Sequence, residues 1–88
     1  MDIKNGQKAL ITLDDWFNAK DGQTYKAVWG RCFVHPAEKI LGLTPAASTN
    51  WFLQVGQGED AVIIAGCRIH YAQLCNEKPS GTNVLCLE

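Results

Sequence analysis

The sequence lacks a hydrophobic run long enough to cross a membrane. Its longest unbroken apolar stretch runs only from Ala61 to Cys67, whereas a transmembrane helix needs about 20 apolar residues. The first residues, Met1 to Lys8, are polar and contain no apolar segment of the kind that a secretory signal peptide carries. These absences argue against a membrane-spanning helix and predict a cytoplasmic protein with no membrane partner.

An excess of charge of either sign is also missing. The 88 residues carry a formal net charge of −1, whereas general nucleic-acid binders use a cationic surface. A local basic patch is compatible with this balance, so nucleic acid stays open as a partner but is not favoured. A chain of this length forms one domain, 1–88, and buries only roughly 60–65% of its unfolded surface, which favours further burial against a partner subunit.

Paired metal-ligand spacings are absent. No Cys-x-x-Cys or His-x-x-x-His pair occurs among the four cysteines and two histidines, which are Cys32, Cys67, Cys75, Cys86, His35 and His70. Each histidine follows a cysteine by three positions, and residues three apart in a strand point to opposite faces. Because a structural zinc site needs three or four converging ligands, we predict no metal, no cofactor and four reduced cysteines that pack as small hydrophobic residues.

No nucleophilic constellation is complete either. A reactive cysteine needs a nearby cation or helix N-terminus that lowers its pKa, and Cys32 has Arg31 beside it and His35 three residues later. Adjacent side chains of a strand diverge, however, and no third group that would orient the histidine can be named. We therefore predict no catalytic residue, and a cysteine-dependent enzyme is the least favoured of three functional interpretations.

Two glycine-interrupted apolar runs dominate what the sequence does contain. They are Ala27–His35 and Ala61–Tyr71, and both are rich in β-branched and aromatic residues, which favour strands. The chain is therefore predicted to be mainly β: a small antiparallel β-barrel or curved sheet of four to five strands with one short helix.

The first half of the chain is predicted to form an antiparallel hairpin. A strand over Lys8–Phe17, with alternate apolar residues on one face, is followed by a second strand over Thr24–Val34. Asp21-Gly22 between them supplies the positive φ that a tight turn requires.

Gly30 interrupts the second of these strands. Trp29 lies on one alternating row, whereas Cys32 and Val34 lie on the other. One extra residue at Gly30-Arg31 would bring both rows to one face, so a bulge is predicted there.

The second half is predicted to contain a short helix over Pro36–Gly42, an irregular loop over Thr44–Thr49 and another hairpin. This hairpin joins a third strand, Asn50–Gln57, to a fourth, Ala61–Leu74. The fourth strand has one apolar face, with the members Ile63, Ala65, Cys67, Ile69 and Tyr71.

The C-terminal part is predicted to consist of a flexible tail and a short last segment. From about residue 76 its composition predicts a flexible tail, Asn76–Asn83. Val84–Cys86 is expected either to add a short edge strand or to pack on a neighbouring subunit. Leu87-Glu88 is a pair that a cloning site can leave ahead of a purification tag, so neither residue is used for the functional predictions made from the sequence.

Four basic side chains form the first candidate binding site. Arg31, His35, Arg68 and His70 would gather on one face if the second and fourth strands came together, and arginine recognises phosphate or carboxylate groups bidentately. The alternative is a solvated face with weak cross-strand ion pairs.

The aromatic residues form the second candidate. One small core cannot enclose all of them, and exposed aromatic residues mark interfaces. The preferred contact pair is Trp51 and Phe52, with Phe52 pointing away from the face that Trp51 shares with Leu53 and Val55. The alternative is that all of the aromatic residues are core or boundary residues.

Two segments, Lys20–Gly30 and Asn50-Trp51-Phe52, resemble small uncharacterised proteins encoded by phages and prophages. This resemblance brings no catalytic motif, and it implies a bacterial accessory protein that inhibits or adapts a host complex. The favoured prediction is a non-catalytic protein-binding module that self-associates as a homodimer or binds a host protein. The alternative is a small nucleic-acid- or nucleotide-binding barrel that uses Arg31 and Arg68.

Overall fold

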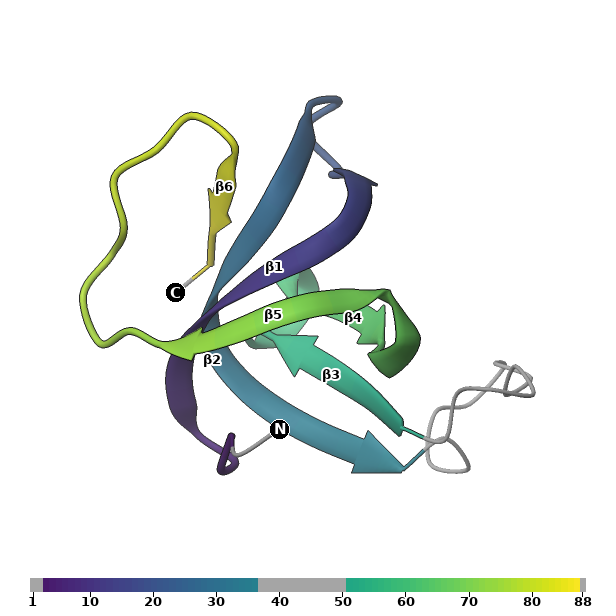
Figure 1. Cartoon of the computed structure of the whole chain (residues 1–88), viewed down its shortest axis with the longest axis vertical. Helices are drawn as coiled ribbons and strands as arrows, with labels where there is room; N and C mark the ends of the chain where they lie inside the picture. Colours follow the sequence, from purple (N-terminus) through teal and green to yellow (C-terminus); the bar gives the residue numbers. More distant parts are fainter. Residues whose placement is uncertain (1–2, 37–50, 88) are drawn as a thin grey trace.

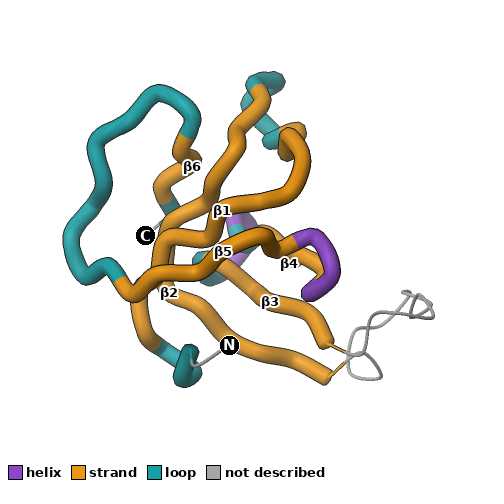
Figure 2. Tube along the Cα trace, in the orientation of Figure 1, coloured by secondary structure: helices purple, strands orange, loops and turns teal. Residues whose placement is uncertain are grey.

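The computed structural model describes residues 3–36 and 51–87, and strands dominate this part of the chain (Figures 1 and 2). In chain order the strands are β1 (Gln7–Asn18), β2 (Thr24–Pro36), β3 (Trp51–Val55), β4 (Val62–Ala65), β5 (Ile69–Leu74) and β6 (Val84–Cys86). Two single turns of 3₁₀ helix, η2 (Gly58–Asp60) and η3 (Gly66–Arg68), flank β4. The prediction of a mainly β chain is confirmed, with six strands described where four to five were expected. The short helix predicted over Pro36–Gly42 lies outside the described residues, except for Pro36, which ends β2.

The strands form one curved sheet in the order β4-β3-β2-β1-β5, and β6 pairs with β2. All pairs along this path are antiparallel, whereas β6 runs parallel to β2. β4 and β5 are therefore the two ends of the path, and no pairing between them closes the sheet within the described residues. Of the two predicted architectures, the curved sheet is the one observed, and the closed barrel is not.

The β1–β2 hairpin forms as predicted. Gly22 has a φ of +84°, and the Ala19 amide donates a 2.9 Å hydrogen bond to the Gln23 carbonyl across the turn. The Tyr25 hydroxyl donates to Asp21 Oδ2 at 2.7 Å, and the Gln23 amide donates to Oδ1 at 2.8 Å. These two bonds hold the pKa of the Asp21 carboxyl below its ordinary value.

The predicted bulge at Gly30-Arg31 is wrong. The β1–β2 register is constant on both sides of Gly30, and the irregularity lies in β1 between Thr12 and Phe17. A Cβ atom on Gly30 would lie 2.5 Å from the carbonyl oxygen of Leu87. The glycine is therefore needed because the C-terminal segment approaches the backbone of β2 closely.

The buried core is built from residues of β1, β2, β3 and β4. β1 contributes a row of alternate residues that are almost fully buried, as the sequence predicted. The buried cluster consists of Ala9, Ile11, Leu13, Val28, Cys32, Leu53, Val55 and Ile64. Trp29 is buried on the opposite face of β2, where its indole N–H donates a 2.8 Å hydrogen bond to the carbonyl oxygen of Cys75.

The single fourth strand predicted over Ala61–Leu74 is wrong, because the chain bends at η3. Before the bend, β4 pairs with β3, and after it, β5 pairs with β1. The indole of Trp51 packs against Gly66 so closely that a Cβ atom there would lie 2.7 Å from its Nε1. The predicted apolar face is also wrong: Ile64 is buried, whereas Ile63 and Cys67 are exposed.

Candidate interaction surface

Within residues 3–36 and 51–87, β5 is an edge strand whose outer backbone groups have no strand partner. The Cys75 amide donates a 3.2 Å hydrogen bond to the Lys8 carbonyl, and bonded positions alternate along an antiparallel pair. In the β1–β5 register, Tyr71 and Gln73 therefore face β1, whereas Ala72 and Leu74 turn their N–H and C=O groups away from it. Among the described strands, β1 is the only neighbour of β5.

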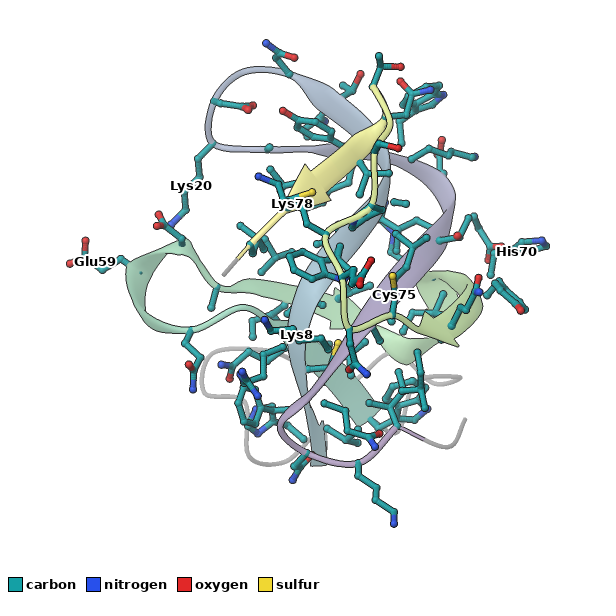
Figure 3. All side chains as sticks on the ribbon, turned by 90° about the vertical axis from the view of Figure 1, so that its left-hand side faces the viewer. Lys8, Lys20, Glu59, His70, Cys75 and Lys78 are labelled. Atoms are coloured by element: carbon teal, nitrogen blue, oxygen red, sulfur yellow. The ribbon has the colours of Figure 1, made fainter. Side chains whose placement is uncertain are left out.

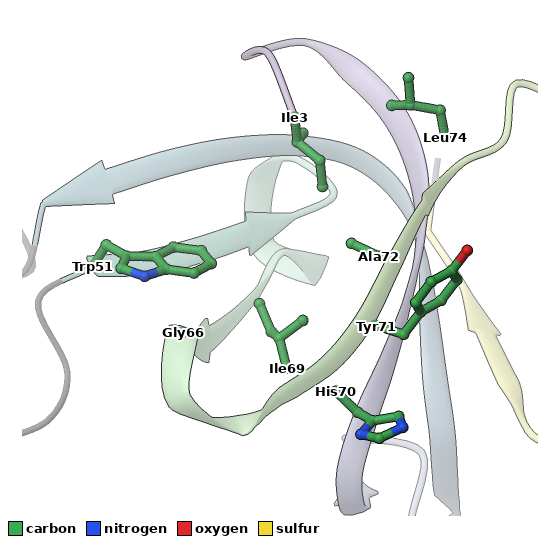
Figure 4. Close-up of a pocket in the computed structure, with 8 residues that line it drawn as sticks. All are labelled: Ile3, Trp51, Gly66, Ile69, His70, Tyr71, Ala72 and Leu74. Carbon is green, nitrogen blue, oxygen red and sulfur yellow. The ribbon is translucent and has the colours of Figure 1, made fainter. Parts of the chain in front are cut away.

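A hollow of about 440 Å³ opens beside this edge (Figure 4). It lies between β5, the start of β3 and the N-terminal segment. Figure 4 shows Trp51, Ile3 and Ile69 approaching it from these three directions, while the ring of Tyr71 lies on the other side of β5. Apart from His70 its lining is uncharged, and its members are Ile3, Trp51, Gly66, Ile69, His70, Tyr71, Ala72 and Leu74.

The edge carries large exposed side chains with little protection. Tyr71 and Leu74 are 57% and 55% exposed. Natural edge strands are commonly guarded by lysine, proline, inward-pointing charges or bulges, and β5 contains no lysine, proline or acidic residue. Its register shift lies at the His70 end, so the part from Tyr71 to Leu74 is regular and available for pairing.

The structure separates the predicted aromatic pair. Trp51 lines the hollow and packs against the core, as expected for its face. Phe52 does not belong to the core cluster, which agrees with its predicted direction, but it is only 8% exposed. Its assignment as an exposed contact residue is therefore wrong, because its outward face is covered. Tyr71 and Leu74, which line the same hollow as Trp51, are more than half exposed.

The four basic side chains do not form one cluster. β1 lies between β2 and β5, so the condition for their gathering is not met. Arg31 Nη1 donates to the Gly6 carbonyl at 2.6 Å, and Arg68 Nη2 donates to the Trp16 carbonyl at 3.4 Å. The bend at η3 explains this outcome, because it carries the second apolar run across to the far side of β1.

The two histidines have separate partners. His35 is half-buried on β2, with its Nε2 atom 3.0 Å from Gln54 Oε1. His70 Nδ1 lies 3.1 Å from Asp14 Oδ1, and both side chains are more than half exposed. Solvent screens such a pair, so it adds little to stability. Of the predicted residues, Trp51 and His70 line the same hollow beside β5, and His35 lies opposite Phe52 in the β2–β3 register.

The four cysteines differ in their surroundings. Burial raises the pKa of the Cys32 thiol to about 11, which leaves it a poor nucleophile at neutral pH. Cys67, predicted to lie in an apolar row, is exposed. Cys75 is half-buried, and its thiol donates to the Glu77 carbonyl at 2.9 Å. Residues 3–36 and 51–87 contain no group of three or more His, Cys, Asp or Glu side chains that could hold a metal ion.

Tyr71 and Leu74 are surface residues that were not predicted from the sequence. Tyr71 was predicted on an apolar face because the run through Gly66 reads as one strand. An interior glycine is a signal for a bend or a close contact, and Gly66 carries that signal within a run of β-forming residues.

Comparisons with protein-family models, with curated protein sequences and with solved structures find no match to this chain. Within the described ranges, no helix has the length and hydrophobicity that a membrane crossing requires.

Proposed function

We propose that this protein is a non-catalytic protein-binding module that self-associates through the free edge of β5. The observation that carries the proposal is the edge itself. Its unpaired backbone groups at Ala72 and Leu74 lie beside an apolar hollow, and Tyr71 and Leu74 are more than half exposed there.

A second copy of the chain is the occupant that this edge favours. Two β5 strands related by a twofold axis run antiparallel, so the N–H and C=O groups of Ala72 and Leu74 in one copy can bond those of the other. β5 contains no acidic residue, lysine or arginine, so a copy of the same strand brings no strong like-charge repulsion. The pairing leaves neither copy with a free β5 edge, and it covers the hollow that Trp51 and Ile3 line.

Two further observations support binding in preference to chemistry. The most deeply buried thiol, Cys32, has a raised pKa, the opposite of what nucleophilic catalysis needs. Arg31 and Arg68, which the alternative nucleic-acid function would use, contact backbone carbonyls on different parts of the sheet. The exposed apolar edge is a feature that a protein partner can bury.

The experiment uses proline substitutions on the two free edges. Ala72→Pro removes an N–H group that faces away from β1, and proline is tolerated at such positions of edge strands. We expect it to weaken self-association at least about tenfold, because two intermolecular bonds related by the twofold are lost. Sedimentation across a hundredfold dilution measures the effect, and circular dichroism confirms the fold.

Ile63→Pro is the matched control on the other edge. The Gly56 amide donates to the Arg31 carbonyl, so in the β3–β4 register Ile63 turns its N–H group away from β3. This variant should associate like the wild type. A wild-type protein that stays monomeric at every concentration contradicts the proposal, as do equal effects of the two prolines. Binding that is instead specific to single-stranded nucleic acid and salt-dependent would favour the alternative function.

A further inference from the structure

The C-terminal strand β6 is held at the edge of β2 by a regular set of backbone contacts. The two strands are parallel, with Ala27 opposite Val84 and Trp29 opposite Cys86. The Asn83 carbonyl accepts hydrogen bonds from the amides of Lys26 and Ala27, at 2.9 and 3.1 Å, and the Leu87 amide donates to the Trp29 carbonyl at 2.7 Å. β6 therefore binds as an extended segment added to a sheet edge.

The surface that receives β6, here called the β6 seat, is shaped for alternate aliphatic side chains. It consists of the edge of β2 from Ala27 to Gly30 together with Gly56. Leu85 and Leu87 both pack against the core cluster. A Cβ atom on Gly56 would lie 3.0 Å from Leu87 Cβ, and one on Gly30 would lie 2.5 Å from the Leu87 carbonyl oxygen. Two glycines thus make room for one incoming residue.

The connecting segment, Asn76–Asn83, joins β6 to the rest of the sheet and arcs around it (Figure 1). Figure 3 looks onto the side of the molecule along which this segment runs, with its Lys78 labelled. No strand pairing involves this segment. The interactions that fix β6 are those of the β6 seat, and the same interactions are available to a β6 strand from another molecule.

The connecting segment has little length to spare. β5 and β6 flank the β1–β2 pair, so they are three strand spacings apart, about 14 Å. Cys75 is bonded to Lys8, which lies opposite Arg31 on β2. Asn83 lies beside Lys26, which is about 17 Å from Arg31 along β2. The segment therefore spans on the order of 20 Å, and its eight Cα–Cα steps reach at most about 28 Å.

We propose that the β6 seat accepts the segment Val84–Leu87 of a second copy of this chain, so that two molecules exchange their C-terminal strands. The proposal goes beyond the proposed function, because it uses no group of β5. In the intact chain the connecting segment supplies β6 at an effective concentration on the order of millimolar. Exchange between copies is therefore suppressed until the intramolecular route is blocked.

Shortening the connecting segment tests the proposal in the full chain. Deletion of Lys78–Gly81 leaves four Cα–Cα steps, about 14 Å, which cannot span the required distance. In the Ala72→Pro background, which removes association through β5, we expect this deletion to convert a monomer to a dimer with native circular dichroism. A folded monomer would overturn the proposal without affecting the proposed function, and a monomer that loses its fold would overturn it too.

Complementation between two full-length variants provides a second measurement. The double substitution Leu85→Asp, Leu87→Asp puts charges on the two side chains that pack against the core. The strand can then no longer bind, and the seat stays intact. Gly30→Ala leaves the strand intact but blocks the seat, because the new Cβ would lie 2.5 Å from the carbonyl oxygen of Leu87, whose amide is bonded to Trp29. Each variant alone should be a monomer in the Ala72→Pro background, and the mixture should form a one-to-one complex.

Gly81→Ala is the matched control for the second partner. A Cβ atom on Gly81 meets only Val84 Cγ2, at an ordinary 3.6 Å, so the seat of this variant stays filled by its own strand. It should therefore form at least tenfold less complex with the Leu85→Asp, Leu87→Asp chain than Gly30→Ala does. No complex with either partner, or equal amounts with both, contradicts strand exchange.

Discussion

The contact between Trp51 and Gly66 allows a prediction whose sign depends on the structure. Gly66 is the first residue of η3 and has no positive φ, so the backbone itself accepts alanine. Elsewhere such a change stabilises a protein by roughly 0.4–1 kcal/mol, because it reduces the freedom of the unfolded chain. Here the new Cβ would lie 2.7 Å from both Cζ2 and Nε1 of Trp51.

The expected size follows from the rigidity of the indole. A Cβ atom at that distance forces the ring or the backbone to move, and such overpacking costs about 1–3 kcal/mol. Gly66→Ala should therefore lower the free energy of unfolding by about 1–2 kcal/mol net. Trp51→Leu removes the clashing ring, so in that background the same glycine substitution should be neutral or stabilising.

Urea denaturation of the wild type, the two single variants and the double variant measures the effect of Gly66→Ala with and without the Trp51 ring. This double-mutant cycle subtracts the cost of losing the Trp51 side chain, which is present in both proteins of that background. The coupling energy should be at least about 1 kcal/mol. If Gly66→Ala has the same effect with tryptophan and with leucine at position 51, the bend does not depend on this contact.

Three further substitutions test the hairpin turn, the buried Cys32 and the hydrogen bond between Trp29 and Cys75. Gly22→Val should lower the melting midpoint, with a cost of about 1–2 kcal/mol, because Gly22 has a φ of +84°; an unchanged midpoint contradicts this. Cys32 should react last with iodoacetamide, and its pKa of about 11, raised from 9.0, means that its contribution to stability is present below pH 9.0 and is lost as the pH rises towards 11. Cys32→Ala should remove that part of the alkaline slope. Trp29→Phe should cost about 1 kcal/mol in urea denaturation, because the hydrogen bond to the Cys75 carbonyl is lost.

Local signals in the sequence predicted the first half of the fold well. Asp21-Gly22 located the turn, and the alternation of Ala9, Ile11 and Leu13 identified the buried face of β1. Both signals depend on residues close together in the chain. The hairpin is a local structure, so its turn and its apolar face are sufficient to define it.

The two glycines inside the apolar runs were harder to interpret, because the residues that pack against them are far away in the sequence. Gly30 makes room for Leu87, and Gly66 makes room for Trp51. A glycine signals that something requires the space of a side chain, but it does not say whether that is a bulge, a bend or another segment. Only the tertiary contacts decide between these.

The same distinction explains why the candidate surface was predicted on the wrong residue. Alternation along β3 correctly placed Phe52 opposite Leu53, but a face turned away from the core is exposed only if nothing covers it. Trp29 shows this on β2, where it lies outside the core cluster and is nevertheless 1% exposed. Tyr71 is 57% exposed, and its ring lies on the side of β5 away from the hollow (Figure 4). Which strand comes last follows from the bend at Gly66, and the free edge is therefore a consequence of topology that alternation along a strand cannot reveal.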